Sequence, residues 1–212
     1  MELNLGGRVA IVTGASRGIG SVIAAQLERE GAIVYPLDVT PPPDGPEPIR
    51  FLPADITRQD QVEAATRTVL EREGRIDILV NNAGINAVGS LESVDLDLAA
   101  RCFAVNVTGL LAMCQAVIPA MKRARHGRII NAASFAAIVP AQGNGIYAAS
   151  KSAVVQLTRV LAGELGPWDI TVNAYAPGMI PTAINGFTEL PADDQDRLLD
   201  TLTLRRWGTA SE

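Results

Sequence analysis

The sequence predicts an α/β protein with a doubly wound parallel sheet. Short runs rich in valine and isoleucine alternate with longer stretches of helical periodicity, which is the pattern of repeated βα units. A glycine-rich turn, TGASRGIG, directly follows the first of these runs. Aromatic residues make up only 4% of the 212 residues, which favours helices packed on a sheet over an aromatic-rich β-sandwich. A chain of this length is expected to form one domain.

Six strands and four helices are expected along the chain. The strands are rich in valine or isoleucine and therefore suit burial on both faces of a parallel sheet. Right-handed crossovers between such strands give the order 3-2-1-4-5-6. The expected strands span residues 8–13, 32–37, 49–53, 76–81, 127–131 and 170–175. The expected helices span residues 18–30, 59–73, 96–123 and 147–165.

The connection between the second and third strands is expected to lack a helix. Pro41, Pro42, Pro43, Pro46, Pro48 and Pro53 all stand between Asp38 and Asp55. Proline lacks an amide donor and biases the residue before it toward extended geometry. Residues 40–48 are therefore expected to form a stiff surface loop in place of a crossover helix.

The composition excludes several classes of function. Eighteen Lys and Arg against 23 Asp and Glu give a net charge of −5, and without a local basic patch no nucleic-acid partner is expected. Residues 1–7 lack the features of a signal peptide, and no apolar run is long enough to span a bilayer, so a cytoplasmic protein with no membrane partner is expected. Cys102 and Cys114 are expected to be buried free thiols. His126, the only histidine, lies in a polar cluster, so we expect a surface residue and no metal site.

The glycine-rich turn is the first candidate binding site. Glycine lets backbone approach a pyrophosphate, and the following helix offers free amides and a partial positive charge at its N-terminus. Asp38 ends the second strand 18 residues after Gly20, where a carboxylate can accept hydrogen bonds from an adenosine ribose. It would repel a 2′-phosphate, although Arg17 could partly compensate. This combination favours NAD over NADP, whereas a glycine turn needed only for close packing is the alternative.

Tyr147 and Lys151 form the second candidate site. They are four residues apart at the start of a helix and therefore share a face. Tyrosine, with an ordinary pKa of about 10, is a poor acid or base near neutrality, but an adjacent ammonium and an oxidised nicotinamide would lower that pKa. Ser134 follows the strand at 127–131 and falls at the carboxyl edge of the sheet, where doubly wound folds bind ligands. Alternatively, the pair is a chance spacing on a solvated helix and Ser134 an ordinary strand-end residue.

Together these motifs resemble the short-chain dehydrogenase/reductase family over nearly the whole chain. TGASRGIG resembles the family's TGxxxGIG turn, NNAG at 81–84 its NNAG motif, YAASK at 147–151 its YxxxK motif, and PGMIPT at 177–182 its PGxxxT segment. Ser134 matches the active-site serine, and Asn106 the helix asparagine of the catalytic tetrad. The resemblance implies that residues 1–212 form one Rossmann-type domain that binds a dinucleotide and carries the catalytic residues.

The resemblance also implies a reaction, hydride transfer between the nicotinamide C4 and a carbinol or carbonyl carbon. Tyr147 would exchange a proton with the substrate oxygen, Lys151 would lower the pKa of Tyr147 and bind the nicotinamide ribose, and Ser134 would hydrogen-bond the substrate oxygen. Asn106 would hold a water that links Lys151 to solvent, or it satisfies backbone groups within its own helix. Asp55 and Ile56 would border the adenine, and Thr182 would contact the carboxamide. The implied NAD-binding residues are Gly14, Ser16, Arg17, Gly18, Ile19, Gly20, Asp38, Asp55, Ile56, Asn82, Ala83, Gly84, Tyr147, Lys151, Pro177, Gly178, Ile180 and Thr182.

The expected substrate is an uncharged or weakly polar secondary alcohol or ketone, because the residues expected around it are neutral and largely apolar. Ser134, Gln142, Tyr147 and Met179 are the expected substrate contacts. A 3-oxoacyl thioester reductase is the alternative substrate class, disfavoured because acyl carrier proteins call for a basic surface. A nucleotide-binding but inactive paralogue, with a regulatory or scaffold role, is the rival class of protein. The expected pocket residues are Asn86, Ala87, Phe135, Ala136, Gln142, Met179 and Ile180.

Members of the family usually continue past residues 205–209 through another helix and a seventh strand. This chain ends at Glu212 and is expected to lack that strand, either as a fragment or with an unusual sheet edge at residues 170–175. Apolar residues on more than one face of helices 96–123 and 147–165 predict a homodimer, and the resemblance implies pairing of these two helices about a two-fold axis. A tetramer is expected where the missing C-terminal part is present.

Overall fold

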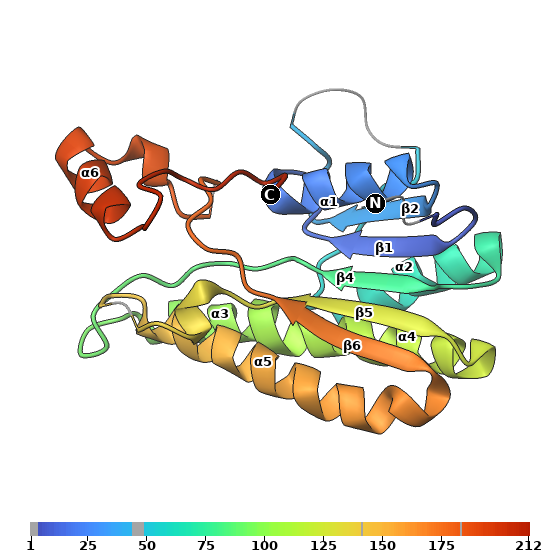
Figure 1. The fold of residues 1–212 in the computed structure, drawn as a ribbon. Helices are drawn as coiled ribbons and strands as arrows, with labels where there is room; N and C mark the ends of the chain where they lie inside the picture. Colours follow the sequence, from blue (N-terminus) through green and yellow to red (C-terminus); the bar gives the residue numbers. More distant parts are fainter. Residues whose placement is uncertain (1–3, 44–48, 141, 183) are drawn as a thin grey trace.

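The computed structural model describes residues 4–43, 49–140, 142–182 and 184–212. Its strands form one parallel sheet in the order β3-β2-β1-β4-β5-β6 (Figure 1). The predicted fold class and strand order are therefore confirmed. The strands are β1 (Val9–Thr13), β2 (Ile33–Asp38), β3 (Leu52–Pro53), β4 (Ile78–Asn81), β5 (Gly127–Ala132) and β6 (Ile170–Tyr175).

Helices cover both faces of the sheet. One helix, α1, lies on one face, and the other face is covered by α2, α4 and α5 (Figure 1). The helices are α1 (Gly18–Arg29), α2 (Gln59–Glu73), α3 (Leu96–Phe103), α4 (Leu110–Ala124), α5 (Gly145–Leu165) and α6 (Ala192–Asp200). The sequence patterns did not predict α6, whose nine residues are mostly polar and pack outside the main core.

The central strands supply most of the core. Every residue of β1 and β4 is buried. Because side chains alternate along a strand, Ile11 packs into the core beneath α2, α4 and α5, whereas Val12 packs into a second core beneath α1. Burying an aliphatic side chain of this size contributes about 1.5–3 kcal/mol. The two-sided burial explains why β-branched runs, rather than alternating polar and apolar residues, mark these strands.

The helix predicted at residues 96–123 is one continuous helix, but its middle is π-helical over Ala104–Gly109. The Asp95 carboxylate caps its start by accepting a hydrogen bond from the amide of Asp97 (2.8 Å), and Arg125 ends it in a left-handed conformation. The composite helix 96–124 is long and apolar enough to cross a membrane by length and composition, contrary to the expectation that no segment is. It is also a core helix, with Met113 and Val117 fully buried beneath the sheet.

The third strand is shorter than predicted. Only Leu52 and Pro53 pair with β2, and Ile49, expected to begin this strand, is 96% exposed. The loop predicted at residues 40–48 falls partly outside the described residues, which omit 44–48. The described residues on either side of that gap, up to β3, form no helix, as the prolines led us to expect.

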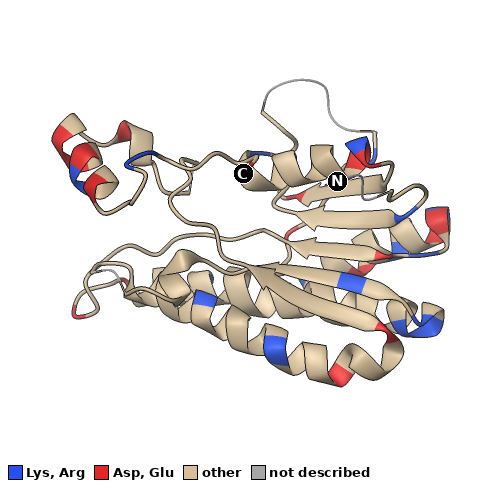
Figure 2. Cartoon of the chain, viewed as in Figure 1, with Lys and Arg blue, Asp and Glu red and all other residues tan. Residues whose placement is uncertain are grey.

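Residues 184–212 form a small lobe around α6 that faces the carboxyl ends of the strands (Figure 1). The ring of Trp207 stacks on that of Phe187, with centroids 5.2 Å apart. The amide of Gly208 donates to the carbonyl of Met179 (3.0 Å), which ties the lobe to the segment that follows β6. Figure 2 shows Lys, Arg, Asp and Glu gathered on α6 and at the far end of the sheet, while the ribbon between them is mostly uncharged.

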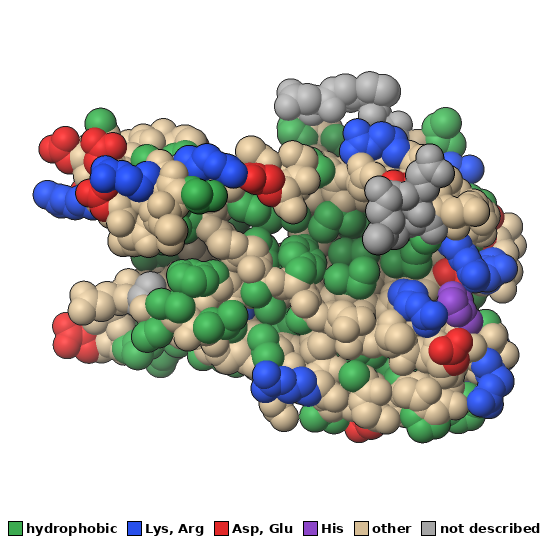
Figure 3. Space-filling view, in the orientation of Figure 1, with side chains coloured by type: hydrophobic (Ala, Val, Ile, Leu, Met, Phe, Trp, Pro, Cys, Tyr) green, Lys and Arg blue, Asp and Glu red, His purple; other side chains and the backbone are tan. Residues whose placement is uncertain are grey.

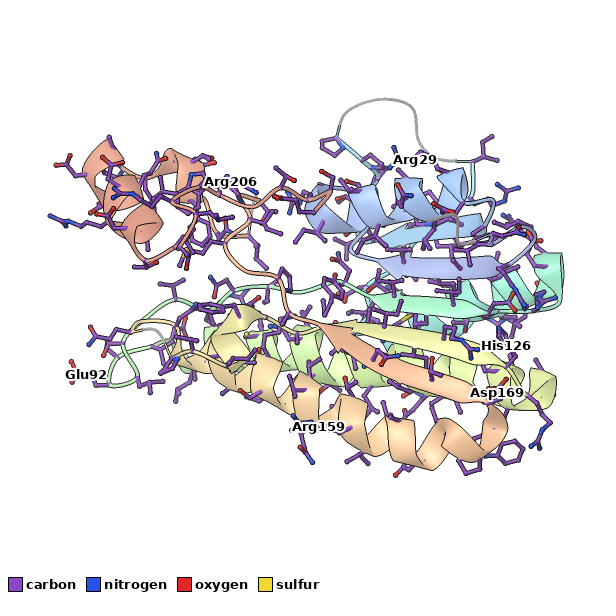
Figure 4. All side chains as sticks on the ribbon, in the orientation of Figure 1. Arg29, Glu92, His126, Arg159, Asp169 and Arg206 are labelled. Atoms are coloured by element: carbon purple, nitrogen blue, oxygen red, sulfur yellow. The ribbon has the colours of Figure 1, made fainter. Side chains whose placement is uncertain are left out.

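Both cysteines are buried free thiols, as predicted. His126 lies beside Asp169, at the end of the sheet away from the lobe that carries Arg206 (Figure 4). Its side chain is 25% exposed, and its Nδ1 is 3.9 Å from the Asp169 carboxylate. Burial, together with the charge of Arg128, lowers the pKa of His126. Within the described part of the chain, no three His, Cys, Asp or Glu residues are grouped so that they could hold a metal ion.

Candidate active site

A cavity of about 710 Å³ opens at the carboxyl ends of the strands. On the face drawn in Figure 3, the surface is hollowed between the α6 lobe and the rest of the molecule, with hydrophobic side chains on both sides. The cavity brings together residues that are far apart in the sequence, from the glycine-rich turn to the segment after β6. The predicted site residues that line it are Gly14, Arg17, Gly18, Ile19, Asp38, Asp55, Ile56, Asn82, Ala83, Gly84, Tyr147, Lys151, Pro177 and Thr182.

The glycines of the turn are required by its geometry. Gly14 and Gly18 have φ angles of 64° and 59°, in the left-handed region that favours glycine. A Cβ atom on Gly14 would lie 2.7 Å from the Cα of Ala83, and one on Gly20 would lie 2.2 Å from the carbonyl oxygen of Gly14. The turn is therefore packed backbone to backbone, with the N-terminus of α1 facing the cavity. Free amides at a helix N-terminus are suited to hold a pyrophosphate.

We expect Gly20→Ala to weaken NADH binding by about tenfold or more, because the turn must move to admit a methyl group and its amides lose their alignment. Gly163→Ala is the matched control. Gly163 lies inside α5, and an added methyl group there would have no atom within 4 Å. The same substitution at Gly163 therefore adds up to about 1 kcal/mol of helix stability and leaves NADH binding unchanged. NADH fluorescence titration measures both variants. Unaltered affinity in Gly20→Ala would show that the turn does not carry the cofactor.

Asn82 ties this turn to the middle of the sheet. Its side-chain nitrogen donates to the carbonyls of Thr13 and Gly14, both at 3.1 Å, and its side-chain oxygen accepts from the Tyr175 hydroxyl at 2.8 Å. Burial raises the pKa of Tyr175, which keeps this phenol protonated as a donor. Tyr175 lines the cavity at the end of β6 and was not among the predicted site residues. The rule that singled out Ser134 after β5, a polar side chain at the carboxyl edge, applies equally to it.

Two backbone amides hold the Asp38 carboxylate at the rim of the cavity. One oxygen accepts from the amide of Ser16 (3.0 Å), and the other accepts from the amide of Val39 (2.8 Å). The Ser16 hydroxyl donates to the carbonyl of Thr40. Ser16, predicted as a cofactor contact, does not line the cavity; it supports Asp38 from behind. The carboxylate is thus fixed at the end of β2, where the strand pattern placed it.

Lys151 is buried beside Tyr147. Only 3% of Lys151 is exposed, and its ammonium donates to the carbonyl of Ala132 (2.7 Å) at the end of β5. Burial lowers the pKa of Lys151 to about 8. Lys151 Nζ lies 5.7 Å from the centre of the Tyr147 ring.

Burial is the main influence on the pKa of Tyr147 in the protein alone. It raises that pKa, and the Ser134 hydroxyl offsets part of the rise. The ammonium of Lys151 donates to the Ala132 carbonyl and lies beside the Tyr147 ring. Ser134 caps the 3₁₀ turn Phe135–Ala137, and its oxygen accepts from the amide of Ala136 (3.2 Å). The Ser134 hydroxyl thus interacts with Tyr147, although Ser134 itself does not line the cavity.

Asn106 lies in the π-helical turn, and only 1% of it is exposed. Its side chain accepts from the amide of Ile85 (2.9 Å) and donates to the carbonyl of Ile85 (3.0 Å) and to Ser150 Oγ (3.0 Å). The side chain therefore satisfies backbone outside its own helix, contrary to the alternative that it satisfies backbone groups within it; its bond inside the helix is to the Cys102 thiol (3.3 Å). Gly109, at the end of the turn, packs so closely on Ile56 that a Cβ would lie 2.7 Å from it.

The remaining predicted residues lie outside the cavity lining. Gln142 is exposed, and residues 178–180 are fixed to the C-terminal lobe, where the carbonyl of Ile180 accepts from Asn185 (2.8 Å). Of the expected pocket residues only Asn86 lines the cavity. The predicted residues that do not line it are Ser16, Gly20, Ala87, Asn106, Ser134, Phe135, Ala136, Gln142, Gly178, Met179 and Ile180. Lining residues that the sequence analysis did not assign to cofactor, substrate or catalysis include Val39, Arg101, Val105, Tyr175 and Ile184.

The fold and the cavity define a dinucleotide-binding α/β oxidoreductase. A family model described as short chain dehydrogenase matches residues 8–191, so the chain belongs to the short-chain dehydrogenase family, whose members use a nicotinamide cofactor. The chain is 37% identical over 221 residues to a 3-oxoacyl-(acyl-carrier-protein) reductase of Pseudomonas aeruginosa, spanning 99% of this chain and 88% of that protein. It is 35% identical over 182 residues to a 3-ketodihydrosphingosine reductase of Bacteroides thetaiotaomicron, spanning 86% of this chain and 66% of that one.

Solved structures agree with the fold. An NAD⁺-bound xylitol dehydrogenase superposes with a TM-score of 0.88 at 26% identity, over 98% of this chain and 89% of that one. A gluconate 5-dehydrogenase from Burkholderia cenocepacia, in complex with NADP and tartrate, superposes with a TM-score of 0.90 at 31% identity, over 99% of this chain and 86% of that one. Relatives of this fold thus bind either form of the cofactor.

Proposed function

We propose that this protein transfers a hydride between NAD(H) and an uncharged or weakly polar secondary alcohol or ketone. The observation that carries the proposal is that one cavity joins Tyr147 and Lys151 to a glycine turn and to the Asp38 carboxylate. The residues fit a dinucleotide, because the turn leaves no room for side chains at Gly14 and Gly20 and α1 begins at the cavity. We propose that residues 1–212 act as one binding and catalytic domain.

The bound nicotinamide would supply or accept the hydride at its C4. In the reduction, the Tyr147 phenol donates its proton to the carbonyl oxygen as the carbon gains the hydride, and the phenolate then regains a proton from solvent. The Ser134 hydroxyl donates to the same oxygen. A buried phenol with a raised pKa is protonated at neutral pH and suits this donor role. The Lys151 ammonium stabilises the transient phenolate, and Asn106 holds the Ile85 backbone beside it.

The cofactor choice is proposed as NAD because the Asp38 carboxylate is fixed at the rim where the adenosine ribose would lie, and like charge disfavours a 2′-phosphate. We expect Asp38→Ala, alone or with Val39→Arg, to shift the ratio of kcat/KM for NADP over NAD by about tenfold or more. Steady-state kinetics with both cofactors measures the shift. An unshifted ratio would mean that Asp38 does not reach the ribose.

A panel of secondary alcohols, ketones and 3-oxoacyl thioesters tests the reaction class, with NAD⁺ and NADP⁺ or their reduced forms and absorbance at the reduced-nicotinamide band. The proposal expects turnover of the simple alcohols or ketones. Turnover restricted to thioesters would favour the 3-oxoacyl alternative, in keeping with one of the relatives. NADH binding without turnover of any member would favour the rival, a nucleotide-binding paralogue with a regulatory or scaffold role.

We propose that the protein is cytoplasmic and pairs as a homodimer through helices 96–123 and 147–165. Phe103 in α3 and Val160 in α5 support the pairing, because these large apolar side chains are 38% and 46% exposed in the single chain. Light scattering over a concentration series tests it. A monomer at micromolar concentration would exclude the helix-paired dimer.

A further inference from the structure

Ser150 is a fully buried hydroxyl in α5 that the catalytic scheme above does not use. It stands next to Lys151 in the sequence and is 0% exposed. Its Oγ donates to the carbonyl of Tyr147 (2.7 Å) and accepts from the side-chain nitrogen of Asn106 (3.0 Å). Serine often bonds back to a carbonyl of its own helix, but here the hydroxyl also bonds to a second element. Ser150 therefore joins the first turn of α5 to the π-helical turn Ala104–Gly109.

These hydrogen bonds continue from Asn106 to the segment that follows β4, which lines part of the cavity. Asn106 bonds both backbone groups of Ile85, and a Cβ on Gly84 would lie 3.2 Å from Asn106 Oδ1 and 3.4 Å from Lys151 Nζ. Gly84 and Ile85 both line the cavity. An unbroken set of hydrogen bonds thus runs from the backbone at Ile85 through Asn106 and Ser150 to the backbone of Tyr147.

The start of α5 is weakly capped. Its N-cap residue, Asn144, makes no capping hydrogen bond with its side chain, and Tyr147 is the third residue of the helix. First-turn residues of an uncapped helix are held less firmly than interior ones. The bond from Ser150 to the Tyr147 carbonyl therefore acts where the orientation of the phenol is set.

We propose that Ser150 is a positioning residue, which keeps the Tyr147 phenol in register with the Gly84–Ile85 backbone of the cofactor cradle. The inference rests on the proposed function, since it assigns Ser150 a role in proton transfer by Tyr147. A purely structural hydroxyl would stabilise the fold without altering the reaction. A positioning hydroxyl controls kcat and the pKa of Tyr147, while cofactor affinity stays the same.

The same helix carries a matched control. Thr158 Oγ1 donates to the carbonyl of Val154 (2.8 Å) and accepts from the side-chain nitrogen of Asn131 (2.9 Å). This is the same pair of bonds as at Ser150, two turns further from Tyr147 and directed at the sheet. Thr158 is also buried, so Thr158→Ala removes an equivalent hydroxyl remote from the cavity.

The test compares the unaltered 212-residue chain with Ser150→Ala, Ser150→Thr, Thr158→Ala and Tyr147→Phe. For Ser150→Ala we expect kcat to fall about tenfold while the KM for NADH stays unchanged, because a displaced reacting group loses rate without losing cofactor contacts. The apparent pKa in the kcat profile should rise, because Tyr147 loses part of the Ser134 interaction that lowers its pKa while burial persists. Ser150→Thr keeps the hydroxyl, so we expect the wild-type kcat and the wild-type apparent pKa. Thr158→Ala lowers the melting temperature but changes neither.

Ser150→Ala is expected to fold, since alanine favours a helix more than serine does and Asn106 keeps the Ile85 carbonyl as an acceptor. Unchanged kcat and pKa in Ser150→Ala would overturn the inference, as would an equal loss of kcat in Thr158→Ala. Tyr147→Phe separates the two proposals. If that variant is inactive while Ser150→Ala behaves as the wild type, only the positioning role fails. If Tyr147→Phe keeps its turnover, the proposed function fails and the positioning role fails with it.

Discussion

Replacing Tyr147 by phenylalanine is expected to lower kcat by about 10²- to 10⁴-fold, the usual contribution of a positioned proton donor. The substitution removes one oxygen, so the packing of the ring and the cavity around the cofactor are preserved. NADH affinity should therefore stay within the range of the wild type. Initial-rate assays with the best alcohol or ketone of the panel measure the rate, and NADH fluorescence measures the binding.

Tyr35→Phe is the control for this substitution. Tyr35 lies in β2, is 1% exposed, and donates its hydroxyl to Glu73 (2.7 Å) outside the cavity. Loss of that bond is expected to cost about 1 kcal/mol of stability with no change in kcat. If both variants kept the wild-type rate, Tyr147 would not be the proton donor. If kcat fell in Tyr35→Phe as well, the loss would reflect general damage to the folded structure and not the loss of a proton donor.

Lys151→Met is expected to lower kcat by about 10²-fold or more, because a transient phenolate in a buried site loses the ammonium beside it. Methionine keeps an unbranched side chain of similar length. The variant is also expected to differ from the wild type in how its stability depends on pH. Burial lowers the pKa of Lys151 from 10.5 to about 8, so between these pH values the unfolded chain holds a proton that the folded chain has released.

The sign of that effect comes from proton linkage. Where the unfolded state binds more protons, stability rises with pH, so the wild type gains up to about 3 kcal/mol between pH 8 and pH 10.5. Lys151→Met lacks this gain. Urea unfolding of both proteins near pH 7 and again near pH 10 isolates it, because other titrating groups are common to both. A constant difference between the two proteins would show that Lys151 does not titrate with a lowered pKa.

Local sequence patterns were sufficient to predict the glycine turn, Asp38 and the Tyr147–Lys151 pair of the candidate site. The turn after β1 is contiguous in sequence. Its glycines lie where the strand pattern placed them, and so does Asp38. Tyr147 and Lys151 needed only a helical spacing of four. In each case the position of the side chain depends on a single strand or helix and on where that element begins or ends. Hydrophobic periodicity in the sequence reveals both.

Other parts depend on contacts between distant segments. The π-helical turn exists where Asn106 bonds Ile85 and Ser150, and nothing in the local run of small and apolar residues marks it. Ser16 supports Asp38 only because the turn and the end of β2 meet in space. The rise in the pKa of Tyr147 comes from burial, which a motif does not report. The C-terminal lobe is held by the contact of Gly208 with Met179, and it lies beyond the regular βα pattern.

The π-helical turn has an evolutionary consequence. Such a turn uses one residue more than an α-helical turn, so the helix 96–124 behaves as a helix that has gained an inserted residue. In a regular α-helix an added residue would rotate the rest of the helix by about 100°, but the wider π-helical turn absorbs that residue. The half before the turn and the half after it therefore keep their own faces, the first facing the cavity with Arg101 and the second burying Met113 in the core. Loss of one residue within the turn would therefore convert it to a regular α-helical turn and leave both halves of the helix in register.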